Sequence, residues 1–391
     1  MRRIDAAERR ARLARRHRLA PTARAADPVE AAASVVVLHA TDPATVFLAA
    51  AARMRSPEVA AIERALYEER SLVRMLGMRR TMFVVPRELA PVVQSSSTRA
   101  IAVLERRRTL QLLATTGVAA DPAAWLAGVE DATVAALAGL GEATGAELSA
   151  AVPGLRTQVL MAEGKAYEAV QNITTRVLTL LSVDGRIIRG RPRGSWISSQ
   201  YRWSPAAAWL AGGIPDHPEP EARAELVRRW LAAFGPGTEA DLRWWTGWTL
   251  GQVRAALAAT GAVAVDLDGI PGLALAGDLE PEPSTEPWVA LLPALDPTVM
   301  GWAGRDWYLG EHGPALFDRS GNAGPTVWCD GRVVGGWGQP PGGGVALRLF
   351  EDVGTEAAAA VEEVAAALGD WLGPVRVTPR FRTPLERELS G

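Results

Sequence analysis

The chain has 391 residues and a mass of 41.6 kDa, which is too long for one ordinary domain and suits three or four small ones. It is 48% hydrophobic and 22% charged, so it can bury a sizeable core, and its one cysteine excludes internal disulfides, cysteine-based zinc sites and iron–sulfur clusters. The formal net charge is −2, no uncharged apolar run is long enough to span a bilayer and no signal-peptide pattern begins the chain, so we expect a cytoplasmic protein without a membrane span.

The segment 1–108 is strongly basic. It holds 21 arginines and 11 acids, whereas the segment 109–391 holds 21 basic and 33 acidic side chains. Such asymmetry favours one part of the chain facing a polyanion. Every cation except Lys165 is an arginine, whose planar fork suits phosphate. A general compositional bias explains the shortage of lysine equally well, but it does not explain the clustering.

The same segment predicts four helices, a strand and a further helix. Asp42-Pro43 marks a helix start, with Asp42 as N-cap and Pro43 at the first helical position. The predicted elements are helices over 5–18, 28–38, from Asp42-Pro43, and 57–77, then a strand over Arg79–Val85 and a helix from Pro86.

A repeated motif follows. Residues 141–148 and 235–242 both fit G-x-x-T-x-x-[E/D]-L, with Thr144 and Thr238 placed as helix N-caps. A helix precedes each copy, and a second helix and a hairpin follow it. The first copy predicts helices over 122–139 and Tyr167–Val183 and strands over Arg186–Arg189 and Ser195–Ser198; the second predicts helices over 219–234 and Leu250–Thr260 and strands over Val263–Leu267 and Leu273–Ala276.

Helices followed by a two-stranded hairpin are typical of a winged helix, which presents one helix to a DNA groove. Residues 1–108 fit this template less closely. Beyond a proline-rich linker at 281–287, strand-like runs surround Asp330-Gly331, and a helix over 355–372 and a strand over 375–378 follow. The predicted fold class is α+β, with three tandem winged-helix domains (1–108, 109–204, 205–280) and a C-terminal β-rich domain (281–391).

Several segments in this order resemble a known family. They are Leu38-His39-Ala40-Thr41-Asp42-Pro43, Met78-Arg79-Arg80-Thr81, Leu291–Pro297 and Asp330–Trp337. Together they resemble the bacterial winged-helix DNA glycosylases related to AlkZ and YcaQ. The resemblance implies a basic DNA channel, and removal of N7-alkylated purines, including bulky adducts and interstrand crosslinks. Typical members carry Gln-x-Gln or Gln-x-Asp where this chain has His39-Ala40-Thr41, and often a histidine soon after the turn, where it has Arg80 and Phe83.

His39, Thr41 and Asp42 are the candidate catalytic residues. An N7-alkylguanine is already cationic, so an enzyme needs mainly to hold a water and stabilise positive charge developing on the sugar. Neutral His39 could hold or partly deprotonate that water and Thr41 could orient it, whereas protonated His39 would repel the substrate. The alternative is structural: Thr41 or Asp42 caps the following helix, and His39 lies at the edge of the core.

The candidate DNA contacts are arginines in the basic segment and in the hairpin of the second predicted winged helix. They are Arg53, Arg55, Arg79, Arg80, Arg106, Arg107, Arg108, Arg191 and Arg193. For any one of them a solvated surface charge is an equally good interpretation. The histidines share no metal-ligand spacing and no phosphate- or dinucleotide-binding motif occurs, so we expect neither metal nor cofactor.

We therefore expect a monomeric, nucleoid-associated DNA-repair protein, acting as a monofunctional glycosylase on duplex DNA containing alkylated purines. No lysine nucleophile is placed near the site, since Lys165 belongs to the second predicted winged-helix domain. The alternative is a catalytically inactive winged-helix regulator or damage sensor. A dimeric transcription repressor fits less well, because three fused winged helices do not make a symmetric dimer on a palindrome.

Overall fold

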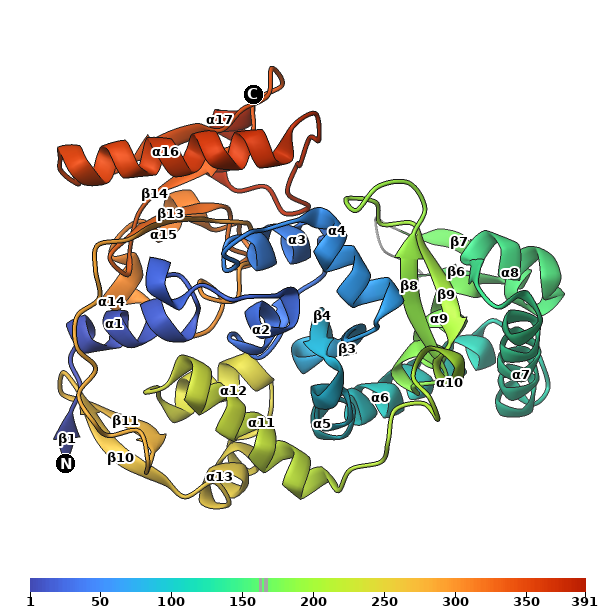
Figure 1. The fold of residues 1–391 in the computed structure, drawn as a ribbon. Coiled ribbons are helices and arrows are strands. Elements are labelled where there is room, and N and C mark those ends of the chain that lie inside the picture. Colours follow the sequence, from blue (N-terminus) through green and yellow to red (C-terminus); the bar gives the residue numbers. More distant parts are fainter. Residues whose placement is uncertain (162–163, 165–167) are drawn as a thin grey trace.

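The structure is a computed structural model that describes residues 1–161, 164 and 168–391. It mixes helices and strands in an α+β fold. Figure 1 shows residues 109–204 at one end of the molecule, away from α1 (Ala6–Arg16) and the hairpin of β10 (Ala262–Leu267) and β11 (Ile270–Leu275). The predicted start of a helix at Tyr167 and the position of Lys165 lie outside the described residues.

The first unit is a three-stranded antiparallel sheet, in the order β2-β4-β3, surrounded by helices. Its elements are α2 (Pro28–Ala33), β2 (Leu38–His39), α3 (Pro43–Ala51), α4 (Val59–Glu63), β3 (Leu72–Gly77), β4 (Thr81–Pro86), α5 (Ala90–Val93) and α6 (Arg99–Thr115).

Two predicted helices in this unit end earlier than expected, one at Ala33 and one at Glu68. The predicted helix over 28–38 ends at Ala33, because Val36 takes a left-handed backbone conformation (φ 65°) and Leu38 then pairs with β4. The predicted helix over 57–77 gives way to strand β3, because Arg70 is also left-handed (φ 55°) and the apolar run from Leu72 is buried on both faces. A buried apolar run fits helix and strand periodicity alike.

The second unit carries the first copy of the repeated motif and its own hydrophobic core, centred on α9. Its elements are α7 (Pro122–Leu140), β5 (Ala143–Thr144), α8 (Gly145–Ala151), β6 (Gln158–Met161), β7 (Ala169–Asn172), α9 (Thr174–Val183), β8 (Ile187–Pro192), β9 (Tyr201–Pro205) and α10 (Ala206–Trp209). The predicted strand over Ser195–Ser198 is wrong: the strand that pairs with β8 is β9, farther along the chain. Residues 169–172, predicted as helix, form β7.

Helix α7 is the one helix of the described chain that is long and apolar enough, by length and composition, to cross a membrane. Its buried residues fall on one stripe that includes Leu126, Val129, Glu130 and Thr133. Glu130 is paired with Arg106 at 3.1 Å. A single buried stripe is typical of a helix lying on a folded unit.

The third unit repeats the helical pattern and pairs with the start of the chain. Its elements are α11 (Glu219–Phe234), α12 (Glu239–Thr246), α13 (Leu250–Ala258), β10 (Ala262–Leu267) and β11 (Ile270–Leu275). Capping boxes at Thr144–Glu147 and Thr238–Asp241 confirm the predicted N-caps. Strand β1 (Arg2–Arg3) pairs with β10 in parallel. The N-terminal strand therefore belongs to the sheet of the third unit and not to the first unit.

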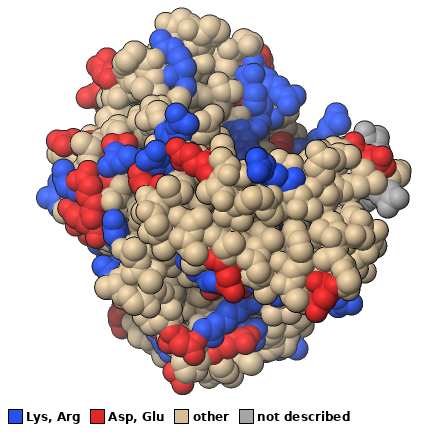
Figure 2. All heavy atoms as spheres, turned by 90° about the vertical axis from the view of Figure 1, so that its right-hand side faces the viewer, with Lys and Arg blue, Asp and Glu red and all other residues tan. Residues whose placement is uncertain are grey.

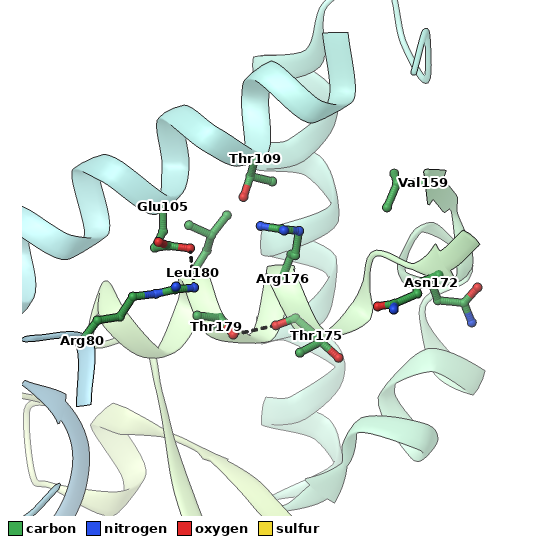
Figure 3. Close-up of a pocket in the computed structure, with 10 residues that line it drawn as sticks. Arg80, Glu105, Thr109, Val159, Asn172, Thr175, Arg176, Thr179 and Leu180 are labelled. Carbon is green, nitrogen blue, oxygen red and sulfur yellow. Dashed lines mark hydrogen bonds and ion pairs between the residues drawn. The ribbon is translucent and has the colours of Figure 1, made fainter. Parts of the chain in front are cut away.

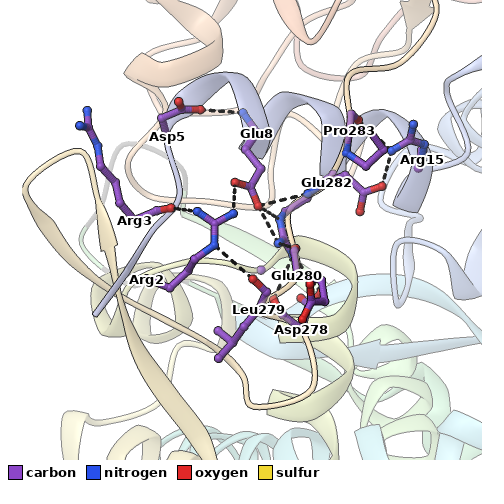
Figure 4. Close-up of polar contacts among 12 residues, drawn as sticks. Arg2, Arg3, Asp5, Glu8, Arg15, Asp278, Leu279, Glu280, Glu282 and Pro283 are labelled. Carbon is purple, nitrogen blue, oxygen red and sulfur yellow. Dashed lines mark hydrogen bonds and ion pairs between the residues drawn. The ribbon is translucent and has the colours of Figure 1, made fainter.

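Several N-terminal arginines are paired with acids at and near the linker, as Figure 4 shows for Arg15 and Glu282. From α1 (Ala6–Arg16), Arg12 binds Glu8 at 2.7 Å and Asp278 at 2.9 Å, and Arg16 binds Asp278 at 2.7 Å. Much of the basic excess counted along the sequence is therefore neutralised inside the fold.

The C-terminal unit is a four-stranded antiparallel sheet with helices on it. Its elements are β12 (Val289–Leu292), α14 (Asp306–Leu309), α15 (Gly313–Leu316), β13 (Thr326–Cys329), β14 (Arg332–Gly338), β15 (Ala346–Leu349), α16 (Thr355–Leu372) and α17 (Pro384–Ser390). The predicted strand over 375–378 is wrong, because this segment has no strand partner; Gln339 holds it by accepting from Val377 N at 2.8 Å. One continuous hydrophobic core joins this unit to the first and third, and it also includes Ile188 and Trp196 of the second.

A buried ion pair fastens the first unit to the C-terminal unit. Arg53 and Asp296 are both fully buried and form two bonds of 2.8 and 2.9 Å. Arg53 also donates to Thr298 Oγ1 at 2.7 Å. Thr298 contacts His17 Nδ1 at 2.8 Å, and burial together with the Arg53 charge lowers the pKa of His17 well below its ordinary value.

Breaking this pair should destabilise the fold strongly. Either Arg53→Met or Asp296→Asn leaves a buried group without its partner, so each variant should lower the free energy of unfolding by about 3–5 kcal/mol. Denaturant unfolding measures this, with the exposed neighbour Arg55→Ala as control, expected within about 0.5 kcal/mol of wild type. Equal stability of Arg53→Met and the control would contradict the role of the pair.

Candidate active site and nucleic-acid interface

The segment from His39 to Asp42 connects strand β2 to helix α3. His39 pairs with Phe83 of β4, and the two rings meet edge to face with centroids 5.6 Å apart. The backbone N–H of Thr41 points at His39 Nδ1, with 3.5 Å between the two nitrogens. His39 and Thr41 are both half-buried overall. Thr41 lines the cavity described below, whereas His39 is not among the residues that line it.

His39 is neutral in this setting. Burial, aided by the positive charge of Arg79, lowers the pKa of His39 from 6.5 to about 3. Because Nδ1 faces a backbone N–H, the neutral tautomer that fits carries its proton on Nε2. The ring is thus an uncharged group whose Nε2–H can donate a hydrogen bond.

Asp42 uses both carboxylate oxygens on backbone groups. It is the N-cap of α3, with Oδ1 accepting from Ala44 N at 3.1 Å, and its Oδ2 accepts from Arg380 N at 3.0 Å. Burial is the main cause that raises the pKa of Asp42. This arrangement suits a structural anchor rather than a base that accepts a proton from water.

Thr41 lines a cavity of about 530 Å³ that three distant parts of the chain enclose; we call it the arginine cavity. Its walls include Thr41 and Arg80 from the first unit, Arg189 and Tyr201 from the second, and Arg380 from the C-terminal unit. All three charged side chains that line it are arginines. Figure 2 shows blue side chains gathered in the upper part of the face on the second-unit side.

Two neighbouring cavities extend the arginine cavity into a groove. One of about 450 Å³ shares Arg189, Ser199 and Tyr201 with it and adds Arg193. The other, of about 180 Å³, shares Arg80 and lies between α6 and α9 (Figure 3). Arginines therefore occur along the groove on both sides of Thr41.

Five of the arginines nominated from the sequence are engaged within the protein. Arg53 is fully buried against Asp296, which removes it from any DNA surface. The others retain some exposure but pair with acids: Arg80 and Arg108 with Glu105, Arg106 with Glu130 and Asp184, and Arg191 with Glu63 and Glu68. A paired arginine has much of its charge compensated before any phosphate arrives.

The remaining four nominated arginines, Arg55, Arg79, Arg107 and Arg193, are exposed. Arg193 lines the 450 Å³ cavity. Arg79 lies over the ring of Trp244 at 4.4 Å, in a turn where Arg79 and Arg80 both take left-handed backbone conformations. That turn directs Arg79 toward the third unit, while Arg80 lines the cavity beside Thr41.

Sequence reasoning missed the residues that shape the cavity most. Arg189 belongs to the same Arg-Gly-Arg-Pro-Arg run as Arg191 and Arg193, but a shift in register after Arg189 decides which of them faces the cavity. No sequence pattern marked Arg74 or Arg380 as part of a site, because only folding brings Arg380 to the cavity wall and Arg74 to the backbone of Ala40. Among the described residues, no group of three or more His, Cys, Asp or Glu side chains is placed to hold a metal ion.

Comparison with known proteins supplies three findings. The family model described as "DNA glycosylase AlkZ-like" matches residues 32–371. The solved structure of Streptomyces sahachiroi DNA glycosylase AlkZ superposes with a TM-score of 0.72 at 20% sequence identity, covering 97% of this chain and 99% of that one. No curated protein matches the sequence.

The neutral state of His39 can be tested by NMR. With a pKa of about 3, its ring signals should not titrate between about pH 5 and 9. His39→Gln identifies the resonance by removing it. A midpoint near pH 6.5 for that resonance would show that the ring is neither desolvated nor under the influence of Arg79.

Proposed function

Because the chain belongs to the AlkZ-like DNA glycosylase family, we propose that it hydrolyses the N-glycosidic bond of alkylated purines in duplex DNA. The lesions in question are N7-alkylguanine-type adducts, with interstrand crosslinks built from such adducts as a further class. The observation that carries the proposal is the position of Thr41 on the wall of the arginine cavity, next to an uncharged His39.

The chemistry needs one water and a cationic base. The C1′–N9 bond breaks, its electron pair neutralises the departing N7-alkylguanine, and the water oxygen bonds to C1′ while its surplus proton goes to solvent. Neutral His39, donating from Nε2, would hold the water oxygen, and the Thr41 hydroxyl would orient it. The uncharged ring avoids repelling the positive charge that develops on the sugar.

Asp42 then serves as the anchor of this segment rather than as a base. Each of its two oxygens accepts from a backbone N–H group, that of Ala44 or that of Arg380, and Asp42 is not among the residues that line the arginine cavity. We propose Arg79, Arg107 and Arg193, with Arg55, as the contacts to DNA phosphates among those nominated from the sequence.

The architecture supports this proposal by analogy with winged-helix proteins. We propose that residues 1–108, 109–204 and 205–280 are three winged-helix units and that residues 281–391 form the C-terminal unit, acting together as a monomer in the cytoplasm. Helices followed by an antiparallel hairpin in the second and third units support the interpretation. An inactive DNA-binding regulator is less favoured, because the family is one of glycosylases.

The direct test is release of N7-methylguanine from methylated duplex DNA. Wild type should release the base, and His39→Ala and Thr41→Ala should each lower the single-turnover rate by about 10–100-fold, because each removes one contact to the water. His39→Gln, which keeps a neutral donor, should retain more activity than His39→Ala.

The pH dependence follows from the same pKa. Lowering the pKa of His39 to about 3 keeps the ring neutral, so its titration should produce no fall in rate between about pH 6 and 9. Wild type that releases no base anywhere in this range would refute the glycosylase assignment. Wild-type rates in both alanine variants would refute the assignment of the site.

A further inference from the structure

Of the three arginines that line the arginine cavity, Arg189 and Arg380 lack an acidic partner within the described part of the chain, whereas Arg80 has one. Arg189 comes from β8 and Arg380 from the segment between α16 and α17, residues 373–383, which we call the strap. The third arginine on the wall, Arg80, is paired with Glu105 at 3.0 Å. Among the residues that the structure describes, no carboxylate oxygen lies within 4.0 Å of a nitrogen in the guanidinium of Arg189 or Arg380.

A further guanidinium lies behind the cavity wall. Arg74 is 3% exposed, and its Nη1 donates to the carbonyl oxygen of Ala40 at 3.1 Å. Its guanidinium carbon is 4.7 Å from the centroid of the Tyr201 ring, and that of Arg189 is 5.7 Å from the same centroid. Arg74 Nε and Nη2 have no hydrogen-bond partner.

The like charges of this cluster act on one another. The pKa of Arg189 is lowered by its burial and also by the charges of Arg74 and Arg380. The charges of Arg380 and Arg74 also act on Asp42, but its oxygens accept from backbone N–H groups and not from a guanidinium. An anion in the cavity would relieve this repulsion and supply acceptors to the guanidinium groups.

The strap holds Arg380 at the cavity through three backbone contacts. Asp42 Oδ2 accepts from Arg380 N at 3.0 Å, and Gln339 both accepts from Val377 N at 2.8 Å and donates to Val375 O at 3.0 Å. Asp42 therefore links the cap of α3, directly beside Thr41, to the residue that brings Arg380. The position of Arg380 is set by the same carboxylate that sets the position of Thr41.

We propose that Arg189 and Arg380 form a phosphate-binding subsite that takes a backbone phosphodiester of DNA beside the nucleotide held at Thr41, with Asp42 as the positioning residue that fixes Arg380. The identity of the ligand rests on the proposed function. The ligand's chemistry, a phosphodiester anion, follows from two guanidinium groups without acidic partners on the wall of a polar cavity.

The experiment is the salt dependence of binding to an undamaged duplex. Arg380→Ala should weaken binding about tenfold near 0.1 M salt and reduce the slope of log K against log salt by about one, the signature of one lost phosphate contact. The matched control is Arg376→Ala. Arg376 is an exposed arginine of the same strap that does not line the arginine cavity and whose Nη1 donates to Gly373 O and Val375 O. Its variant should keep the wild-type slope.

A second variant tests the role of Asp42. In Asp42→Asn the oxygen can still cap α3, since Asn is a good N-cap, but the amide nitrogen cannot accept from Arg380 N. This variant should unfold near the wild-type temperature, lose affinity in the direction of Arg380→Ala, and add little further loss in the Arg380→Ala background. Unchanged DNA binding in a folded Asp42→Asn variant would contradict the positioning role.

Failure of the subsite and failure of the proposed function give different results. Arg380→Ala with the affinity and slope of Arg376→Ala overturns the subsite, even if wild type excises N7-methylguanine. Loss of slope confined to Arg380→Ala supports the subsite, even if no excision is found, because binding to undamaged DNA does not require chemistry.

Discussion

The buried ion pair of Arg53 and Asp296 is the constraint on which the candidate site depends. Every residue of α3 is buried, so the helix has no freedom to shift without opening the core. Arg53, just beyond its C-terminal end, is locked to the C-terminal unit, and Asp42 locks its N-terminal end to the strap. Because a buried charge without a partner is costly, both ends are fixed to the same unit, and the segment bearing His39 and Thr41 is fixed with them.

This constraint gives the C-terminal unit a part in the site. The strap contributes Arg380 to the cavity wall, and Asp296 completes the pair that holds α3. The second unit has its own core and contributes the opposite wall through Arg189 and Tyr201. Ile188 and Trp196 join the second unit to the main core, so the cavity forms at a packed junction between units, a common position for a binding site.

Charge counted along the sequence and charge displayed in space differ in this protein. The basic excess of the segment 1–108 indicated a surface for a polyanion, yet Arg12, Arg15 and Arg16 are neutralised by acids near the linker. Arg53 lies in the core. Sequence composition cannot distinguish an arginine that meets phosphate from one that meets a carboxylate far along the chain, because the partner is supplied only by folding.

The sequence predicted what local chemistry determines. Helix caps at Asp42, Thr144 and Thr238 and the Asp330-Gly331 hairpin follow from short-range hydrogen bonding and turn preferences, and the structure confirms them. Prediction from the sequence failed where contacts with a distant segment determine the secondary structure. Strand β3 is an example, because its conformation depends on pairing with β4. The position of Thr41 at a cavity could not be predicted, because two walls of that cavity come from the second unit and from the strap, both distant from Thr41 in the sequence.

A co-crystal structure tests the central claim most directly: that the damaged nucleotide lies at Thr41 and His39. The ligand would be a duplex with a single N7-methylguanosine whose sugar carries a 2′-fluorine, which resists hydrolysis. The account predicts C1′ of that nucleotide facing the Thr41 hydroxyl and His39 Nε2, with its neighbouring phosphate in the arginine cavity. A duplex bound on another face, with both side chains away from any sugar, would contradict it.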